Sequence, residues 1–166
     1  GTRGSALALW QARTVAGLLE RHGLRSEIVV IRTAGDRLQQ APLSDAGGKR
    51  LFVKEIEDAL LAGEVDLAVH SAKDMSVVLP GGLEIAAVLE REDPRDALVL
   101  PAGAGAGDFA AAAARMPPTA QIGTGSIRRA AQLASALPRA RFAGVRGNVD
   151  TRLRKLDAGD FDALML

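Results

Sequence analysis

The chain has 166 residues, of which 48% are hydrophobic and 25% charged, so it can bury the core of one globular domain or of two small lobes. Its 21 Lys and Arg residues nearly balance its 20 Asp and Glu residues, and only 3% of the chain is aromatic, which argues against a nucleic-acid partner. Because the sequence has no cysteine, no run of roughly 18 apolar residues and no secretory signal, we expect no thiol chemistry, no membrane partner and a cytoplasmic location.

Predicted helices and strands alternate in the first half of the chain. In order, they are a helix that follows Ser5, a strand at 28–31, a helix at 49–62 and strands at 65–70 and 83–89. Ser5 is a suitable N-cap, and the apolar stripe of the first helix includes Trp10, which we therefore expect in the core. Phe52, Ile56 and Leu60 recur four residues apart, which indicates one face of an amphipathic helix.

The second half of the chain continues the same alternation. After a loop rich in Ala, Gly and Pro, the expected elements are a helix at 108–115, a strand at 121–123, a helix at 127–137, a strand at 141–145, a helix at 151–158 and a strand at 161–166. A chain in which strands and helices alternate throughout is predicted to belong to the α/β class.

Two short patterns occur once in each half of the sequence. The segment 1–5 resembles the segment 123–126, and both precede a predicted helix. The segments 62–67 and 158–163 also correspond, since each ends a helix and enters a strand. We therefore expect two lobes of similar βαβαβ build, 1–89 and 90–166. The alternative is a chance similarity between residues that commonly start and stop helices.

Arginine and hydroxyl side chains gather in loops that should follow strands. Ligands of open α/β sheets collect beyond the carboxyl ends of the strands, where helix N-termini offer unpaired N–H groups. The side chains concerned are Thr124, Ser126, Arg128 and Arg129 at one helix start, and Arg146, Asn148 and Arg152 around Gly147. Guanidinium and hydroxyl groups in such a place favour a carboxylate or a phosphate as the ligand. A solvated helix face is the alternative.

The segment 70–74 leaves a predicted strand with polar side chains. Asp74 can act there as an acid, a base or a stabiliser of a cation, with Lys73 balancing its charge, whereas an Asx turn or a helix cap is the alternative. For His70 the alternative is a hydrogen-bonded, half-buried side chain without a functional role. We expect no metal site, because His22 is the only other histidine. Structural ion pairs and caps are expected from Asp66, Glu90, Asp93, Arg95 and Asp96.

A series of motifs runs through nearly the whole chain. They are Thr2-Arg3 with Ser5 and 7–12, then 47–49, 51–55, 66–71 with Lys73-Asp74, 90–97, Gly123-Thr124 with Ser126, Arg128 and Arg129, and 146–149 with 151–153. In this order the motifs closely resemble those of the porphobilinogen deaminase family, also called hydroxymethylbilane synthases, of tetrapyrrole biosynthesis. So many motifs in one order make the resemblance highly specific.

The resemblance implies a transferase that condenses four porphobilinogen molecules head to tail into hydroxymethylbilane on the route to heme, and that releases ammonia each time. It implies two lobes like those of type II periplasmic binding proteins, with the ligand cleft between them. It further implies a third domain, in which a cysteine tethers a dipyrromethane cofactor, and we expect a monomer. Each pyrrole ring carries carboxylate side chains, so a cleft rich in arginine is what such a substrate requires.

The resemblance also assigns roles to individual residues. Asp74 would bond the pyrrole N–H groups and stabilise the positive charge that develops as ammonia leaves. The residues expected to bind carboxylate side chains are Arg3, Ser5, Lys73, Arg128, Arg129, Arg146 and Arg152. Further hydrogen bonds are expected from Ser71, Thr124, Ser126 and Asn148, and the expected binding set also contains Gln11 and Lys49.

The chain departs from the family pattern at several positions. Asp45 stands where a lysine is common, which is expected to weaken cofactor binding, Gly125 replaces a serine, and Met75-Ser76 replaces Val-Pro. The first lobe is expected to be incomplete, without its first strand and its return segment, and the third domain with its cysteine is missing from this sequence. We therefore expect the 166 residues alone to be inactive. The alternative function is a non-catalytic anion-binding module on the same fold.

Overall fold

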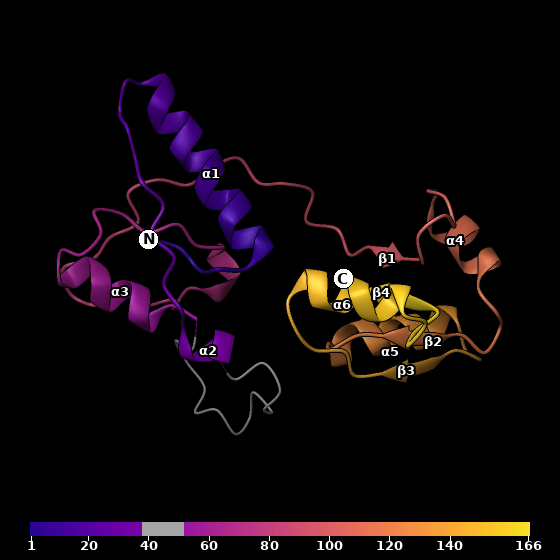
Figure 1. Cartoon of the computed structure of the whole chain (residues 1–166). Helices are drawn as coiled ribbons and strands as arrows, with labels where there is room; N and C mark the ends of the chain where they lie inside the picture. Colours follow the sequence, from indigo (N-terminus) through magenta and orange to yellow (C-terminus); the bar gives the residue numbers. More distant parts are fainter. Residues whose placement is uncertain (38–51) are drawn as a thin grey trace. The chain divides into compact units, whose positions relative to one another are not determined.

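The computed structural model describes residues 1–37 and 52–166, and the chain divides into two compact units, Gly1–Leu89 and Glu90–Leu166 (Figure 1). Helices occur in both units, and the second unit contains a mixed sheet. The α/β class predicted from the sequence is therefore confirmed. Within the described ranges, no helix is long and apolar enough to cross a bilayer.

The regular elements in the described part of unit 1, Gly1–Leu89, are helices. Its elements are α1 (Ala6–Arg21), α2 (Ala34–Arg37), α3 (Lys54–Leu61) and the short 3-10 helix η1 (Ala72–Asp74). α1 begins after the predicted N-cap, because the Ser5 Oγ accepts a hydrogen bond from the Ala8 amide. α3 lies inside the helix that was predicted over 49–62, and it buries Ile56 completely.

The buried face of α1 differs from the predicted apolar stripe. Ala12 is the buried residue of this helix, and Ala8 and Val15 lie on the same side at helical spacing. Trp10 precedes Ala12 by two residues, which places it about 200° around the helix. Trp10 is 51% exposed, so its predicted place in the core is wrong. The side of α1 that carries Ala12, rather than the side that carries Trp10, therefore faces the interior of the unit.

Three extended segments of unit 1 run parallel to one another. A parallel bridge joins Thr2, in the middle segment, to Val30 on one side. On the other side the Gly1 nitrogen donates to Leu67, and the Val69 amide donates to the Gly1 carbonyl oxygen at 3.0 Å. The predicted strands at 28–31 and 65–70 are thus extended segments rather than regular strands.

The predicted strand at 83–89 is wrong. These residues have no regular structure, and the side chains of Ile85 and Val88 are 60% and 83% exposed. Apolar β-branched residues form a strand where a neighbouring backbone pairs with them, and among the described residues no other segment bonds to this stretch.

Unit 2, Glu90–Leu166, is a four-stranded sheet with helices. Its elements are β1 (Leu98–Val99), α4 (Phe109–Arg115), β2 (Gln121–Gly123), α5 (Ile127–Ala136), β3 (Arg141–Ala143), α6 (Val149–Asp157) and β4 (Ala163–Met165). The strand order is β1-β4-β2-β3, in which β1 is antiparallel to β4 and the other pairs are parallel. All of these elements overlap predicted ones except β1, which the sequence analysis missed.

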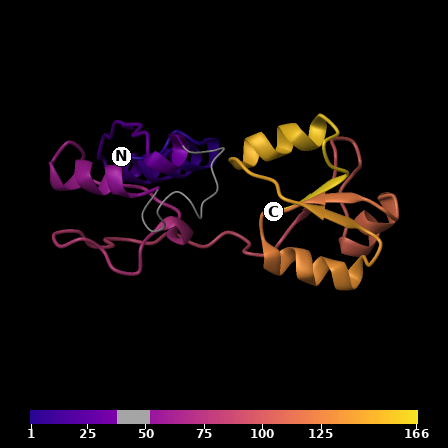
Figure 2. The same cartoon turned by 90° about the horizontal axis from the view of Figure 1, so that it is seen from below.

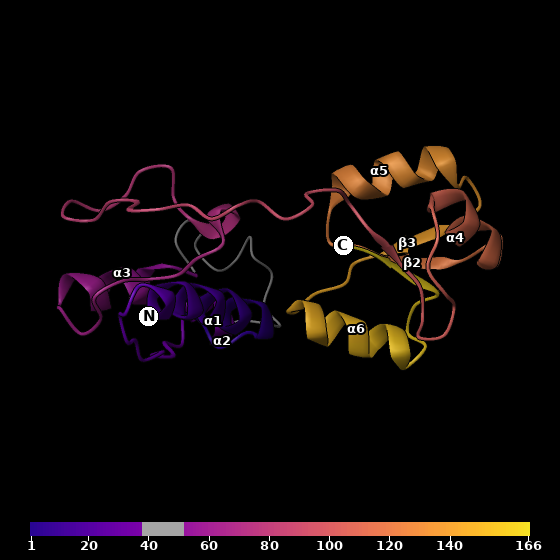
Figure 3. The ribbon, with the colours of Figure 1, turned by 90° about the horizontal axis from the view of Figure 1, so that it is seen from above.

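Two cores lie on opposite faces of this sheet. Ala163 and Met165 of β4 pack in one cluster with Leu133 of α5, whereas Leu164 packs in the other cluster with Leu156 of α6. Successive side chains of a strand point to opposite faces, so β4 is buried between the two helices (Figures 2 and 3). Because β2 and β3 are parallel, the loops that follow them emerge at the same end of the sheet, beyond the carboxyl ends of the strands.

Candidate ligand-binding site

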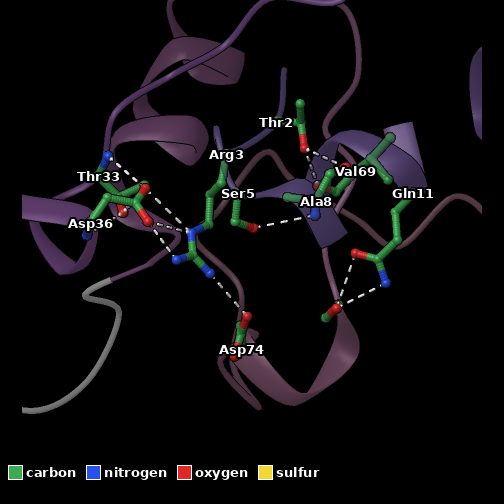
Figure 4. A network of polar contacts seen from close by, with 10 residues as sticks. Thr2, Arg3, Ser5, Ala8, Gln11, Thr33, Asp36, Val69 and Asp74 are labelled. Atoms are coloured by element: carbon green, nitrogen blue, oxygen red, sulfur yellow. Dashed lines mark hydrogen bonds and ion pairs between the residues drawn. The ribbon is translucent and has the colours of Figure 1, made fainter. Parts of the chain in front are cut away.

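Polar side chains of unit 1 meet beyond the carboxyl ends of its three extended segments (Figure 4). Arg3 follows the middle segment, Asp36 follows one neighbour, and Asp74 follows the other. The side chain of Arg3 lies between the two carboxylates. In parallel sheets this end is the place where ligands collect.

The Arg3 guanidinium bonds both carboxylates. Its Nε donates to Asp36 Oδ1 at 3.1 Å and its Nη2 bonds the same oxygen, whereas Nη1 donates to Asp74 Oδ2 at 3.4 Å. The Arg3 Cζ also lies 4.3 Å from the centre of the Phe52 ring, which is a cation–π contact. The side chains of Arg3 and Asp36 are only 12% and 16% exposed. Arg3, expected to bind carboxylates of a ligand, is thus bonded to carboxylates of the chain itself.

Asp36 is a residue of this cluster that the sequence analysis did not single out. It lies in α2, immediately after the fully buried Thr33, and the two residues form a capping box. The Asp36 amide donates to Thr33 Oγ1 and the Thr33 amide donates to Asp36 Oδ2, each at 3.3 Å. Burial alone would raise the pKa of Asp36, but hydrogen bonds from Arg3 and Thr33 outweigh burial and hold that pKa below its usual value. The three-residue spacing of Thr33 and Asp36 could have revealed this turn.

One of the two carboxylate oxygens of Asp74 is available to bind a ligand. Its Oδ2 accepts the bond from Arg3, its side chain is 23% exposed, and its Oδ1 accepts no hydrogen bond from a described residue. The side chain therefore forms neither the Asx turn nor the helix cap that was the alternative. Lys73, next to it in η1, is exposed and makes no ion pair within the described ranges.

Two further predicted residues join α1 to the loop that carries Asp74. The side-chain amide of Gln11 places its Nε2 at 2.9 Å and its Oε1 at 3.0 Å from Ser71 Oγ. Ser71 immediately precedes η1, so this contact fixes the start of that turn. Ser5 serves as the N-cap of α1, and Lys49, together with Asp45, lies outside the described residues.

His70 lies half-buried behind this loop. Burial lowers the pKa of its imidazole, and this effect outweighs the charges of Glu57 and Asp74, which raise it. Its Nε2 is buried and has no hydrogen-bond partner among the described residues. The fully hydrogen-bonded histidine that was the alternative to a functional role is therefore not what the structure contains.

In unit 2, side chains of the loop between β2 and α5 accept hydrogen bonds from backbone amides at the start of α5. Thr124 is buried and its Oγ1 accepts the Ser126 amide at 3.2 Å, while the Ser126 Oγ accepts the Arg129 amide at 3.4 Å. A Cβ atom on Gly125 would lie 3.2 Å from the Val145 carbonyl oxygen. A serine at this position therefore requires that oxygen to move by a few tenths of an ångström.

Asp96 joins the two neighbouring arginines of α5. Its Oδ1 accepts bonds from Arg129 Nε at 3.0 Å and Nη2 at 2.8 Å, and its Oδ2 accepts a longer bond from Arg128 at 3.4 Å. The hydrogen bond from Arg129 is the main cause that holds the pKa of Asp96 below its usual value. The expected structural ion pairs are thus confirmed for Asp96, and likewise for Asp93, which pairs with Arg95.

Arg152 of α6 points to the same end of the sheet. Its Nε donates to the carbonyl oxygen of Gly147 at 2.8 Å. Burial, followed by the nearby charge of Arg129, lowers the pKa of the Arg152 guanidinium. Guanidinium groups from two different helices therefore lie near each other at this end of the sheet, although that of Arg129 is already paired with Asp96. The same loop carries the exposed Arg146 and the half-buried Asn148, which precedes α6 without capping it through its side chain.

A comparison with protein families gives a match over residues 1–166. The matching family model is described as "Porphobilinogen deaminase, dipyromethane cofactor binding domain". The chain belongs to this family. Similar curated proteins include the porphobilinogen deaminases of Syntrophobacter fumaroxidans, 52% identical, and Syntrophomonas wolfei, 51% identical, each over 100% of this chain. The chain spans 52% and 53% of those two relatives, about half of their length.

The cofactor in the family's description fits the side chains of this chain. Dipyrromethane offers pyrrole N–H donors and carboxylate acceptors, which require a carboxylate and cationic donors in the protein. Unit 1 by itself supplies the Asp74 oxygen that accepts no bond from a described residue, and unit 2 by itself supplies the guanidinium groups of Arg129, which is paired with Asp96, and Arg152. Among the described residues, no three His, Asp or Glu side chains come together in a group that could hold a metal ion.

Proposed function

We propose that this chain forms the substrate- and cofactor-binding part of a porphobilinogen deaminase, a transferase that joins four porphobilinogen molecules into hydroxymethylbilane with release of ammonia. The observation that carries the proposal is the match of residues 1–166 to the family model. The position of Asp74, beside Arg3 at the carboxyl ends of three parallel segments, gives the proposal a chemical basis.

Asp74 is the proposed catalytic residue. When bound, the dipyrromethane supplies pyrrole N–H groups and carboxylate side chains. Asp74 would hold such an N–H group through its Oδ1, with its Oδ2 bonded to Arg3. A carboxylate that Arg3 keeps in place can stabilise the positive charge that develops on the substrate when ammonia leaves, because the negative charge is already oriented.

The cationic residues are the proposed ligands of substrate and cofactor carboxylates. In unit 2, Arg129 and Arg152 lie near each other at the end of the sheet, and Arg128, which shares Asp96 with Arg129, is 63% exposed. The exposed Lys73 supplies a further cation next to Asp74 in unit 1. Hydrogen bonds from Ser71, Thr124, Ser126 and Asn148, and the roles of Ser5, Gln11, Lys49 and Arg146, stay predictions from the family resemblance.

Further properties are inferred from the same resemblance and from the composition. They are lobes of the type II periplasmic-binding-protein kind with a ligand cleft, a monomeric state, a cytoplasmic location and the absence of nucleic-acid and membrane partners. The small net charge of +1 supports the absence of a nucleic-acid partner, because the chain as a whole has no strong positive charge to attract a polyanion.

A chimeric polypeptide tests the proposed function. This chain replaces the matching segment of the Syntrophobacter fumaroxidans relative, to which it is 52% identical. We expect the chimera to consume porphobilinogen, and we expect Asp74→Asn to lower turnover by about 100-fold or more, as removal of a group that stabilises transition-state charge does. Porphobilinogen consumption and ammonia release are measured together, and circular dichroism checks the fold.

Asp58→Asn is the matched control. Asp58 lies on the exposed side of α3, where it pairs with Lys54 at 2.6 Å. This variant should retain the turnover of the parent chimera. A folded chimera in which Asp74→Asn and Asp58→Asn have equal activity would contradict the role of Asp74.

A further inference from the structure

We propose that Asp36 is a positioning residue that acts through Arg3 to hold the carboxylate of Asp74 in place. The inference rests on the proposed function of Asp74 and adds Asp36 and Arg3 as the residues that hold its carboxylate. It follows from a continuous chain of contacts that runs from a buried hydroxyl to Asp74 (Figure 4).

The first contact in this series fixes the position of Asp36. Thr33, which is 0% exposed, donates from its Oγ1 to Asp36 Oδ2 at 2.8 Å, and its amide bonds the same oxygen. The start of α2 is in turn joined to α3, because the Ala34 amide donates to Glu55 Oε1 at 2.8 Å. A carboxylate bonded through a buried capping box has little freedom to turn.

The second step is the fixed plane of the Arg3 guanidinium. Asp36 Oδ1 accepts from both Nε and Nη2, which is the fork geometry that sets the direction of an arginine side chain. The Phe52 ring lies against the guanidinium, with 4.3 Å between its centre and Arg3 Cζ. Gly35 permits this packing, since a Cβ at that position would lie 2.2 Å from a carbon of the Phe52 ring.

The third step is the direction of the remaining nitrogen. With the Nε and Nη2 side bonded to Asp36, Arg3 turns its Nη1 toward Asp74 Oδ2 at 3.4 Å. Without Asp36, the guanidinium could rotate so that it binds Asp74 through two nitrogens or turns toward the carboxylates of a ligand. Asp36 thus keeps Arg3 to a single bond with Asp74 and leaves the other carboxylate oxygen for substrate.

The ionised state of Asp36 agrees with this role. Although burial raises the pKa of this carboxyl, the bonds from Arg3 and Thr33 hold the pKa below its usual value. The charged form that binds Arg3 is therefore the one present at neutral pH.

A ligand-free measurement tests the first part of the proposal on the 166-residue chain. The Nε–H signal of Arg3 in nitrogen-15 NMR should be protected from exchange with water in the parent chain and in the control variant Asp58→Asn. We expect Asp36→Asn to increase its exchange at least tenfold. Asparagine keeps an oxygen that can accept from Thr33, so circular dichroism should show a folded variant. An unchanged exchange rate in folded Asp36→Asn would overturn the proposal.

A double-mutant cycle in the chimera tests the second part. Asp36→Asn should lower porphobilinogen turnover by about tenfold to 100-fold, because misplacing a catalytic group by about 1 Å can have that effect. In the background of Arg3→Lys, which keeps the charge but loses the fork, Asp36→Asn should lower turnover by no more than about twofold. Equal losses in both backgrounds would show that Asp36 does not act through Arg3.

The two measurements separate this inference from the proposed function. If the parent chimera does not consume porphobilinogen, the proposed function fails, whereas the NMR result on Arg3 still decides whether Asp36 holds the guanidinium. If the parent is active and the cycle is additive, the proposed function stands and the positioning role of Asp36 is wrong.

Discussion

At the scale of single residues, the loop before α6 depends on a glycine. Gly147 has a φ of +107°, and a Cβ there would lie 2.8 Å from the Thr151 methyl carbon. Its carbonyl oxygen also accepts the bond from Arg152. Both the backbone conformation and the space around it therefore exclude a side chain, and the position of one predicted anion-binding arginine depends on this residue.

Replacing this glycine is expected to destabilise the chain. Gly147→Ala should lower the free energy of unfolding by about 1–3 kcal/mol, because alanine is strained at positive φ and its methyl group meets Thr151. Denaturant unfolding measures the difference. Gly144→Ala is the matched control from the same loop, where a Cβ meets nothing within 4 Å. Equal stability of the two variants would show that the loop conformation of Gly147 is not required.

At the scale of elements, the two helix starts predicted from the repeated pattern share one local structure. Thr2 and Thr124 are both buried, and the serines that follow them, Ser5 and Ser126, both accept a hydrogen bond from an amide of the first helical turn. Local hydrogen bonds of this kind need no distant partner, which explains why α1 and α5 could be predicted from the sequence.

Removal of one cap should weaken its helix. Ser126→Ala deletes the oxygen that accepts the Arg129 amide, and such changes typically lower the free energy of unfolding by about 0.5–2 kcal/mol. Ser135→Ala, an exposed position in the last turn of α5, should change it by less than about 0.5 kcal/mol. The comparison uses denaturant unfolding at neutral pH. A loss of similar size in both variants would contradict a capping role for Ser126.

At the scale of the whole molecule, the half-buried His70 and the ion-paired Asp36 make stability depend on pH. The pKa of each is lower in the folded chain than its usual value, from 6.5 for His70 and from 3.8 for Asp36. In both cases the unfolded chain binds more protons than the folded one in the affected range, so the free energy of unfolding rises with pH. His70 affects the range below about pH 6.5, whereas Asp36 affects the range below about pH 4.

Acidification from pH 7 to pH 5 should therefore destabilise the parent chain through His70. The loss cannot exceed about 1.4 kcal/mol per pH unit for one proton. His70→Gln should show a smaller loss over this range but should still lose stability below about pH 4, where Asp36 takes up a proton more readily in the unfolded chain than in the folded one. His22→Gln, at the exposed end of α1, is the control and should behave like the parent. An identical pH dependence in His70→Gln and the parent would contradict this assignment.

The α/β class, the helix starts at Ser5 and Ser126 and the family could be predicted from the amino-acid sequence, because these depend on local hydrogen bonds, periodicity and motif order. Contacts between residues far apart in the chain, in contrast, became visible in the fold. The strand predicted at 83–89 has no partner among the described residues, and Trp10 lies on the exposed side of α1. The bonds of Asp36 with Arg3 and of Asp96 with Arg129 join residues 33 positions apart, and a pattern along the chain cannot reveal such contacts because backbone packing brings them together.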